Sequence, residues 1–126
     1  MSLLLAFALL GAASAQDVAE QPQEAEITVI AHKLKNWRGD WTLRGDKIVC
    51  KVRKSTGDRQ IDAVGCEAFV VCLTPRVPQF KAISDSKLER KVKDAQVLEE
   101  MKAAIPCIDQ ERSDRIAALA DRRAGS

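Results

Sequence analysis

The sequence predicts an α+β fold: a small antiparallel sheet of two to three strands, covered by two to three helices and stapled by disulfides. Three observations carry the prediction. Residues 41–53 alternate apolar and polar side chains around a Gly-Asp turn, residues 61–72 and 88–105 repeat apolar side chains at helical spacing, and the chain has four cysteines. Its 126 residues suffice for one modest hydrophobic core.

Residues 1–15 are typical of a secretory signal peptide. A short apolar run is followed by Ala-Ser-Ala at positions 13–15, which predicts cleavage before Gln16. A buried N-terminal helix is the structural alternative. The run is too short to span a bilayer, and no later stretch is long and apolar enough to do so. We therefore expect a periplasmic or secreted protein without a transmembrane segment.

Residues 16–25 carry acidic side chains and no basic one, which predicts a solvated tail ahead of a single domain at residues 26–123. The domain begins with Ile27 to His32, a segment rich in β-branched residues that we expect to form a third strand beside the hairpin. The alternative is a free segment that joins the sheet of a partner by strand addition.

Residues 26–31, Glu-Ile-Thr-Val-Ile-Ala, resemble the TonB box of TonB-dependent outer-membrane receptors. In those receptors the box pairs as a strand with the energy-transducing partner, so the resemblance implies a docking segment. The chain has no room for the plug domain and many-stranded barrel of such receptors. The mature chain also resembles small exported Gram-negative proteins of unknown function with a similar pattern of cysteines and Gly-Asp pairs. That second resemblance implies no activity.

The hairpin is predicted from residues 41–44 and 47–53, which flank Gly45-Asp46. A two-residue turn there pairs three sets of residues: Arg44 with Lys47, Leu43 with Ile48, and Trp41 with Cys50. This register gathers the apolar side chains on one face, namely Trp41, Leu43, Ile48, Cys50 and Val52. A slip of one residue would scatter them, so the turn and the pattern agree.

A helix capped by Asp58 is predicted to follow and to cover the apolar face of the hairpin. Its apolar stripe consists of Ile61, Val64, Gly65, Ala68, Phe69 and Cys72. Gly65 on this stripe indicates the close approach of another element. Residues 73–84 contain Pro75 and Pro78 without a helical period, so we expect a loop there.

Ser86 and Glu89 have the spacing of a capping box, which predicts a helix of about five turns after Ser86. Its stripe consists of Leu88, Val92, Ala95, Leu98, Met101 and Ile105. The stripe is shorter than three heptads, which favours core packing over a paired coiled coil. Pro106 is expected to end this helix, and a weaker last helix should follow.

Cys50, Cys66, Cys72 and Cys107 predict two disulfides, because an even number of cysteines in an exported chain is typical of a disulfide framework. Zinc is the alternative, but no close cysteine pair forms a metal knuckle. A Cys66–Cys72 bridge is disfavoured because six helical residues rise about 9 Å, beyond the roughly 7 Å reach of a disulfide. Loop entropy does not separate the two remaining pairings. The direction in which the side chains point favours Cys50–Cys72 with Cys66–Cys107 over Cys50–Cys66 with Cys72–Cys107, since Cys66 points away from the apolar stripe.

No catalytic, cofactor or metal site is expected. His32 is the only histidine, and no carboxylate or hydroxyl partner for it is identifiable nearby in sequence. Paired cysteines leave no thiol nucleophile. The sequence also has no phosphate-binding glycine loop and no carboxylate set with metal spacing.

The candidate binding residues are basic and lie on the polar face of the predicted hairpin: Arg44, Lys47, Lys51 and Arg53. One interpretation is protection of a strand edge, since lysines keep edges from pairing. The functional interpretation is a site for an anionic envelope component, such as lipopolysaccharide or an acidic polymer, or for an envelope protein. Nucleic acid is not expected, because aromatic side chains for base stacking are scarce and tyrosine is absent.

The sequence therefore favours a small exported, disulfide-stabilised protein that binds or associates with the cell envelope and is not an enzyme. The alternative is a small periplasmic hydrolase whose site forms only in three dimensions. A flat basic face would favour binding, whereas a concave pocket with a perturbed acid or base would favour the enzyme.

Overall fold

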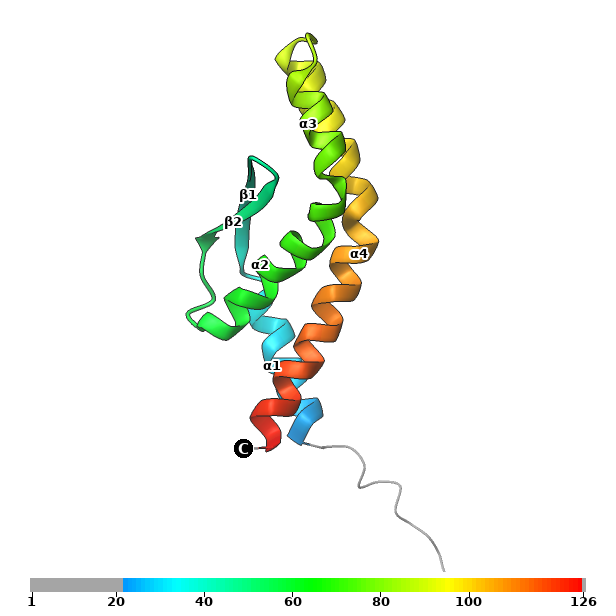
Figure 1. Ribbon diagram of the computed structural model, residues 1–126. Coiled ribbons are helices and arrows are strands. Elements are labelled where there is room, and N and C mark those ends of the chain that lie inside the picture. Colours follow the sequence, from blue (N-terminus) through cyan, green and yellow to red (C-terminus); the bar gives the residue numbers. More distant parts are fainter. Residues whose placement is uncertain (1–21, 126) are drawn as a thin grey trace, which may run out of the picture.

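The computed structural model describes residues 22–125 and confirms the α+β class with two disulfides. The elements in chain order are α1 (Pro22–Leu34), β1 (Arg38–Arg44), β2 (Lys47–Lys54), α2 (Arg59–Leu73), the 3₁₀ helix η2 (Thr74–Arg76), α3 (Val77–Asp85) and α4 (Arg90–Gly125). Helix α4 extends along the long dimension of the described structure, and α3 packs against its first half and α1 against its second half (Figure 1). Helix α2 lies between α4 and the hairpin.

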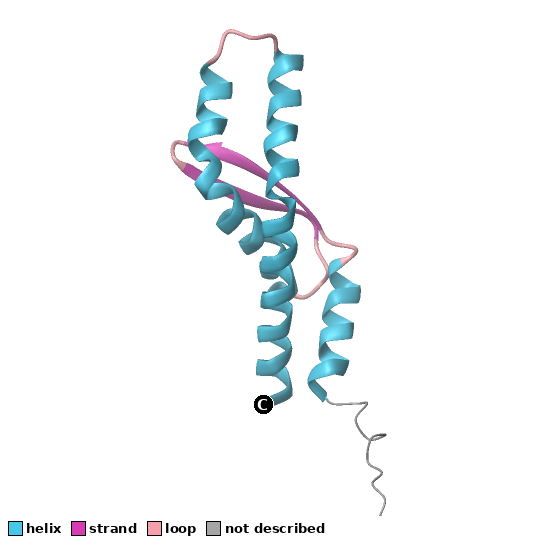
Figure 2. Ribbon diagram, turned by 90° about the vertical axis from the view of Figure 1, so that its right-hand side faces the viewer, coloured by secondary structure: helices cyan, strands magenta, loops and turns pink. Residues whose placement is uncertain are grey.

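The hairpin of β1 and β2 has the predicted register: Arg44 pairs with Lys47, Leu43 with Ile48, and Trp41 with Cys50. Gly45 has φ +60°, a conformation that glycine adopts without steric cost and that two-residue hairpin turns require. The strands cross the long axis of α4 obliquely (Figure 2). Ile48 is buried, and Trp41 and Leu43 pack against the same core cluster.

The structure confirms the predicted N-cap of helix α2 and its predicted apolar stripe. The Asp58 carboxylate accepts hydrogen bonds from the backbone N–H groups of Gln60 and Ile61, at 3.0 and 3.3 Å. The buried residues of the stripe are Ile61, Val64, Gly65, Ala68 and Cys72. Gly65 does mark a close approach, because a Cβ there would lie 2.7 Å from the ring of Trp37.

The predicted third strand is wrong, since residues 27–32 lie inside helix α1. Ile27, Ile30, Ala31 and Leu34 fall on one helical face and pack beside Ile116, Leu119 and Ala120 of α4. Ile30 is completely buried by this contact. The free energy of burying this face outweighs the strand preference of β-branched residues, which is a weak local term. Within residues 22–125 the sheet therefore has two strands.

Residues 22–25 of the predicted acidic tail form the first turn of α1, with Pro22 at the helix start, a position that suits its missing N–H. The remainder of that tail and the predicted signal peptide, residues 1–15, lie outside the described residues.

The loop predicted for residues 73–84 is also wrong, because the chain continues through η2 into α3. Pro75 and Pro78 occupy the first turns of these helices, where a missing N–H breaks no hydrogen bond. Val77 and Phe80 are buried in the main core cluster. The two prolines thus mark helix starts rather than a surface loop.

Helix α4 differs from the prediction in its start, its continuity and its buried face. The Ser86 hydroxyl donates to the carbonyl of Ile83 and closes α3, and α4 begins only at Arg90. Pro106 lies inside the helix, which continues to Gly125. A proline inside a helix costs about 3 kcal/mol, because it removes a backbone hydrogen bond and its ring crowds the preceding turn. Packing of α4 against α2, α3 and α1 on both sides of the proline offsets this cost.

The inward face of α4 consists of Val97, Met101, Ala104, Ile108, Ile116, Leu119 and Ala120. Of the predicted stripe, Leu88, Val92, Leu98 and Ile105 are 42–54% exposed. Helices α1, α2 and α3 all pack against α4. The face of α4 that they bury is therefore rotated about the helix axis from the face that the sequence spacing predicts.

The disulfides join Cys50 to Cys66 and Cys72 to Cys107, with Cα atoms 5.6 and 5.8 Å apart. The favoured pairing of Cys50 with Cys72 and Cys66 with Cys107 is therefore wrong. It assumed that the stripe of α2 faces the hairpin. The stripe also packs against α4 and α1, so Cys72 meets α4, and the flank that carries Cys66 meets β2.

Candidate functional site

The outward face of the hairpin carries the four candidate residues together with two further basic side chains. Its exposed basic residues are Arg38, Arg44, Lys47, Lys51, Arg53 and Lys54, here called the basic hairpin face. Side chains alternate across a strand, so the core-facing Trp41 and Ile48 leave their neighbours pointing to solvent. The structure thus brings all four predicted residues to one exposed surface.

Few carboxylates neutralise this surface. Arg53 Nε donates to Asp40 Oδ2 at 2.5 Å, within the face. Asp46 in the turn pairs instead with Lys81 of α3, and the hydrogen bond and charge of Lys81 lower the pKa of Asp46. Among the described residues, the other five basic side chains of the face have no carboxylate oxygen within 4.0 Å.

Two like-charged pairs lie directly across the hairpin. Arg38 is opposite Lys54 at the open end, and Arg44 is opposite Lys47 beside the turn. Like charges in directly opposed positions destabilise a sheet. The Cys50–Cys66 bridge ties the middle of β2 to α2 and so holds the strands in place against this repulsion.

A hollow of about 370 Å³ adjoins the open end of the hairpin, where β1, α2 and α4 meet. The side chains that shape it are Trp37, Arg38, Asp40, Arg53, Phe69 and Arg112. We call it the Arg112 pocket. Sequence patterns do not indicate it, because its walls come from four separate stretches of chain and Arg112 belongs to no recognisable motif.

Arg112 of α4 forms the inner wall of this pocket. Its guanidinium carbon lies 5.3 Å from the ring centroid of Trp37 and 5.2 Å from that of Phe69. Its Nε is shielded from solvent and has no acceptor among the described residues. Burial lowers the pKa of Arg112, and the nearby charge of Asp109 opposes the shift. The group nevertheless stays cationic at physiological pH, because a guanidinium is too basic to lose its proton in a protein.

Trp37 forms a second wall and is 7% exposed. Its ring lies against Gly39 and Gly65, and a Cβ at either position would overlap it. Its indole Nε1 is buried and has no acceptor among the described residues. The indole of Trp41, in contrast, donates to the sulfur of Met101 at 3.1 Å. The Arg112 pocket therefore includes two side chains whose N–H donors the protein leaves without a partner.

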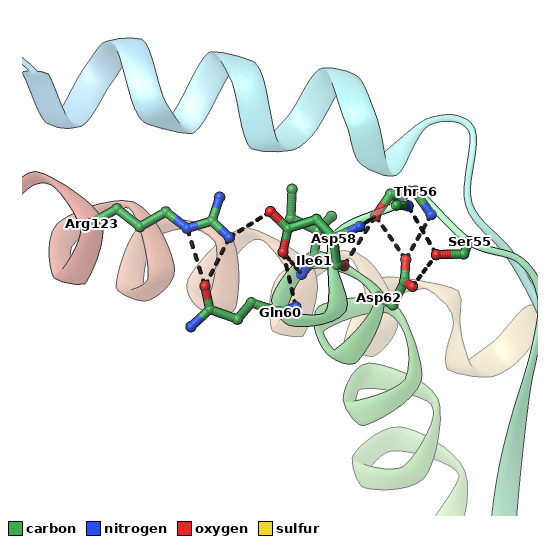
Figure 3. Close-up of polar contacts among 8 residues, drawn as sticks. Ser55, Thr56, Asp58, Gln60, Ile61, Asp62 and Arg123 are labelled. Atoms are coloured by element: carbon green, nitrogen blue, oxygen red, sulfur yellow. Dashed lines mark hydrogen bonds and ion pairs between the residues drawn. The ribbon is translucent and has the colours of Figure 1, made fainter.

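A second polar cluster lies at the start of α2 and has its hydrogen bonds satisfied internally (Figure 3). Asp62 accepts from the hydroxyl of Ser55 and from the backbone and hydroxyl of Thr56. Burial raises the pKa of Asp62, but these hydrogen bonds outweigh burial and the net shift is downward. The hydrogen bonds tie residues 55–56 to the first turn of α2.

The structure offers no assembled set of metal ligands within residues 22–125, where no three His, Cys, Asp or Glu side chains gather. His32 is exposed near the end of α1. None of the helices described between Pro22 and Gly125 is long and apolar enough to cross a membrane.

Comparison with known proteins gives no relative: no protein-family model, no curated protein and no solved structure matches this chain.

Proposed function

We propose that this protein is a small exported binding protein, without enzymatic activity, whose basic hairpin face holds a polyanionic component of the cell envelope. The two disulfides suit a chain that matures in an oxidising compartment. The predicted signal sequence supports the same location.

The observation that carries the proposal is the pair of opposed like charges, Arg38 with Lys54 and Arg44 with Lys47. Protection of a strand edge requires charged side chains, but it does not require cations to face each other across the ladder. An anion between two such cations converts their repulsion into attraction.

The spacing of these charges suits a ligand with repeated anionic groups. Alternate residues of a strand are roughly 6.6 Å apart, and neighbouring strands are about 4.8 Å apart. The cations of the face therefore lie at several separations, from directly opposed pairs to positions two and four residues apart along β2, and phosphate or carboxylate groups on a glycolipid or acidic polymer can match these separations. Because the disulfide holds the hairpin before binding, little conformational entropy is lost when the ligand arrives.

The test is co-sedimentation of the purified protein with vesicles that contain lipopolysaccharide. The Arg44→Gln, Lys47→Gln, Lys51→Gln triple variant should lose most of its binding, and wild-type binding should fall with added salt, since salt screens exposed charges. Arg53 is left intact because it pairs with Asp40 and also lines the Arg112 pocket.

The matched control replaces three exposed lysines away from the hairpin: Lys87, Lys91 and Lys102. This triple variant has the same net charge as the first and should bind normally. Equal loss in both variants would show that net charge alone drives binding. Unchanged binding in the hairpin variant would leave the basic face as edge protection.

A further inference from the structure

The described surface has several hollows, and they differ in whether they include buried N–H donors without an acceptor. The hollow between α3 and α4 has a volume of about 410 Å³ and includes Lys93, whose ammonium group donates to the carbonyl of Ser84 at 2.9 Å. In the Arg112 pocket the corresponding cation makes no hydrogen bond to any described residue. The Arg112 pocket is therefore the hollow in which a ligand could supply a missing hydrogen-bond acceptor.

The orientation of Arg112 determines which part of it remains for a ligand. Its guanidinium lies over the rings of Trp37 and Phe69, and cation–π contact of this kind engages the face of a cation. The side chain is half-buried, and its terminal nitrogens, unlike Nε, are not fully shielded from solvent. An arginine that stacks on aromatic rings through the face of its guanidinium still has N–H groups along the edge of that guanidinium. These N–H groups can bind two oxygens of a carboxylate in parallel.

The charge around the pocket favours an anion. Arg38, Arg53 and Arg112 contribute three cations, and Asp40 contributes one carboxylate that already pairs with Arg53. The rings of Trp37 and Phe69 add apolar surface. The volume of about 370 Å³ lies at the small end of the range for ligand pockets, about 300–1,000 Å³.

From these contacts we propose that the Arg112 pocket is a specific site for a small organic carboxylate with a compact, apolar body. The carboxylate lies against the edge of Arg112, and the body lies toward the aromatic walls. This site adjoins the basic hairpin face and shares Arg38 and Arg53 with it. Arg112 belongs to the pocket and lies outside that face, whereas Arg44, Lys47 and Lys51 belong to the face and lie outside the pocket, so the two proposals can be tested independently.

The test uses ¹⁵N-labelled protein titrated with benzoate, and its two tryptophans provide reporter and control. The indole N–H resonance of Trp37 should shift saturably, whereas that of Trp41, which already donates to Met101, should stay in place. Benzamide has the same shape without the charge and should produce no saturable shift. Acetate should bind more weakly than benzoate, because it lacks the apolar body.

Two substitutions locate the site. Arg112→Gln should weaken benzoate binding about tenfold or more, because it removes a charge-assisted pair of hydrogen bonds. Arg112→Lys keeps the charge but lacks the planar edge, so it should also bind several-fold more weakly. Arg115→Gln removes an arginine from the next turn of the same helix, where it pairs with Glu67 and Glu111, and should leave benzoate affinity unchanged.

The proposal is overturned if the Trp37 resonance shows no saturable shift in the wild type. It is also overturned if benzamide acts as benzoate does, or if Arg112→Lys binds as tightly as the wild type. The hairpin triple variant should retain benzoate binding, and Arg112→Gln should retain vesicle binding. Failure of one proposal is therefore distinguishable from failure of the other.

Discussion

Arg123, two residues before the end of α4 at Gly125, donates from Nη2 to the carboxylate of Asp58 at 2.7 Å (Figure 3). Asp58 is also the N-cap of α2, so one carboxylate caps the start of α2 and holds the end of α4. Both side chains are 24% exposed, which shields the pair from solvent more than a surface ion pair. The last turns of α4 are thereby tied to the start of α2, where the hairpin ends.

Asp58→Ala should lower the free energy of unfolding by about 1–2 kcal/mol, because the helix cap and the ion pair are lost together. Asp58→Asn keeps a capping oxygen and loses only the charge, so its effect should be smaller. Urea unfolding of both variants measures the difference. Equal losses in the two would mean that the cap contributes nothing beyond the ion pair.

Acid should destabilise the protein in part through Asp58 and Asp62. Burial raises the pKa of each, but the hydrogen bonds they accept outweigh it, and each folded-state pKa lies below the ordinary value of 3.8. Their contribution to stability is therefore complete above that value and is lost as the pH falls through the lowered pKa. Between neutral pH and strong acid, the free energy of unfolding should change less steeply with pH in the Asp58→Asn variant than in the wild type. An unchanged slope would assign the acid sensitivity to other groups.

Gly65→Ala should destabilise the protein by about 1–3 kcal/mol, because the added methyl group overlaps the ring of Trp37 and overpacked cores lose about this much. Thermal unfolding gives the comparison. Gly125→Ala is the matched control, since a Cβ there meets nothing within 4 Å. A neutral Gly65→Ala would show that the Trp37 ring moves freely, contrary to its tight position between α2 and β1.

Non-reducing peptide mapping should recover Cys50 linked to Cys66 and Cys72 linked to Cys107. Replacing the first pair by serine should cost about 3 kcal/mol and the second about 4 kcal/mol, since the second closes the longer loop. A map with Cys50 joined to Cys72 would contradict the placement of α2 between the hairpin and α4.

Amide hydrogen exchange should show whether residues 27–32 are held in helix α1 or form a free segment. The amides of Ile30 and Ala31 should be protected in the isolated protein, because their helix packs against α4 and Ile30 is fully buried. Fast exchange at these positions, with the hairpin still protected, would show that α1 opens independently and is available to a partner.

The hairpin and the cap of α2 follow from the sequence because their signals are local. Gly45-Asp46 sets the turn, the alternation around it sets the register, and Asp58 stands just before a helical repeat. The basic hairpin face follows with them, since a known register determines which side chains point outward.

The sequence alone also determined that four cysteines form two bridges and that Gly65 admits a close neighbour. Only the tertiary structure decided that residues 27–32 are helical, that Pro106 lies inside a helix, and which cysteines pair. Each depends on packing against α4, a long-range contact whose free energy exceeds the local preferences of a few residues. The Arg112 pocket belongs to the same class, because its donors come from distant segments that meet only once α4 lies across α2 and beside β1.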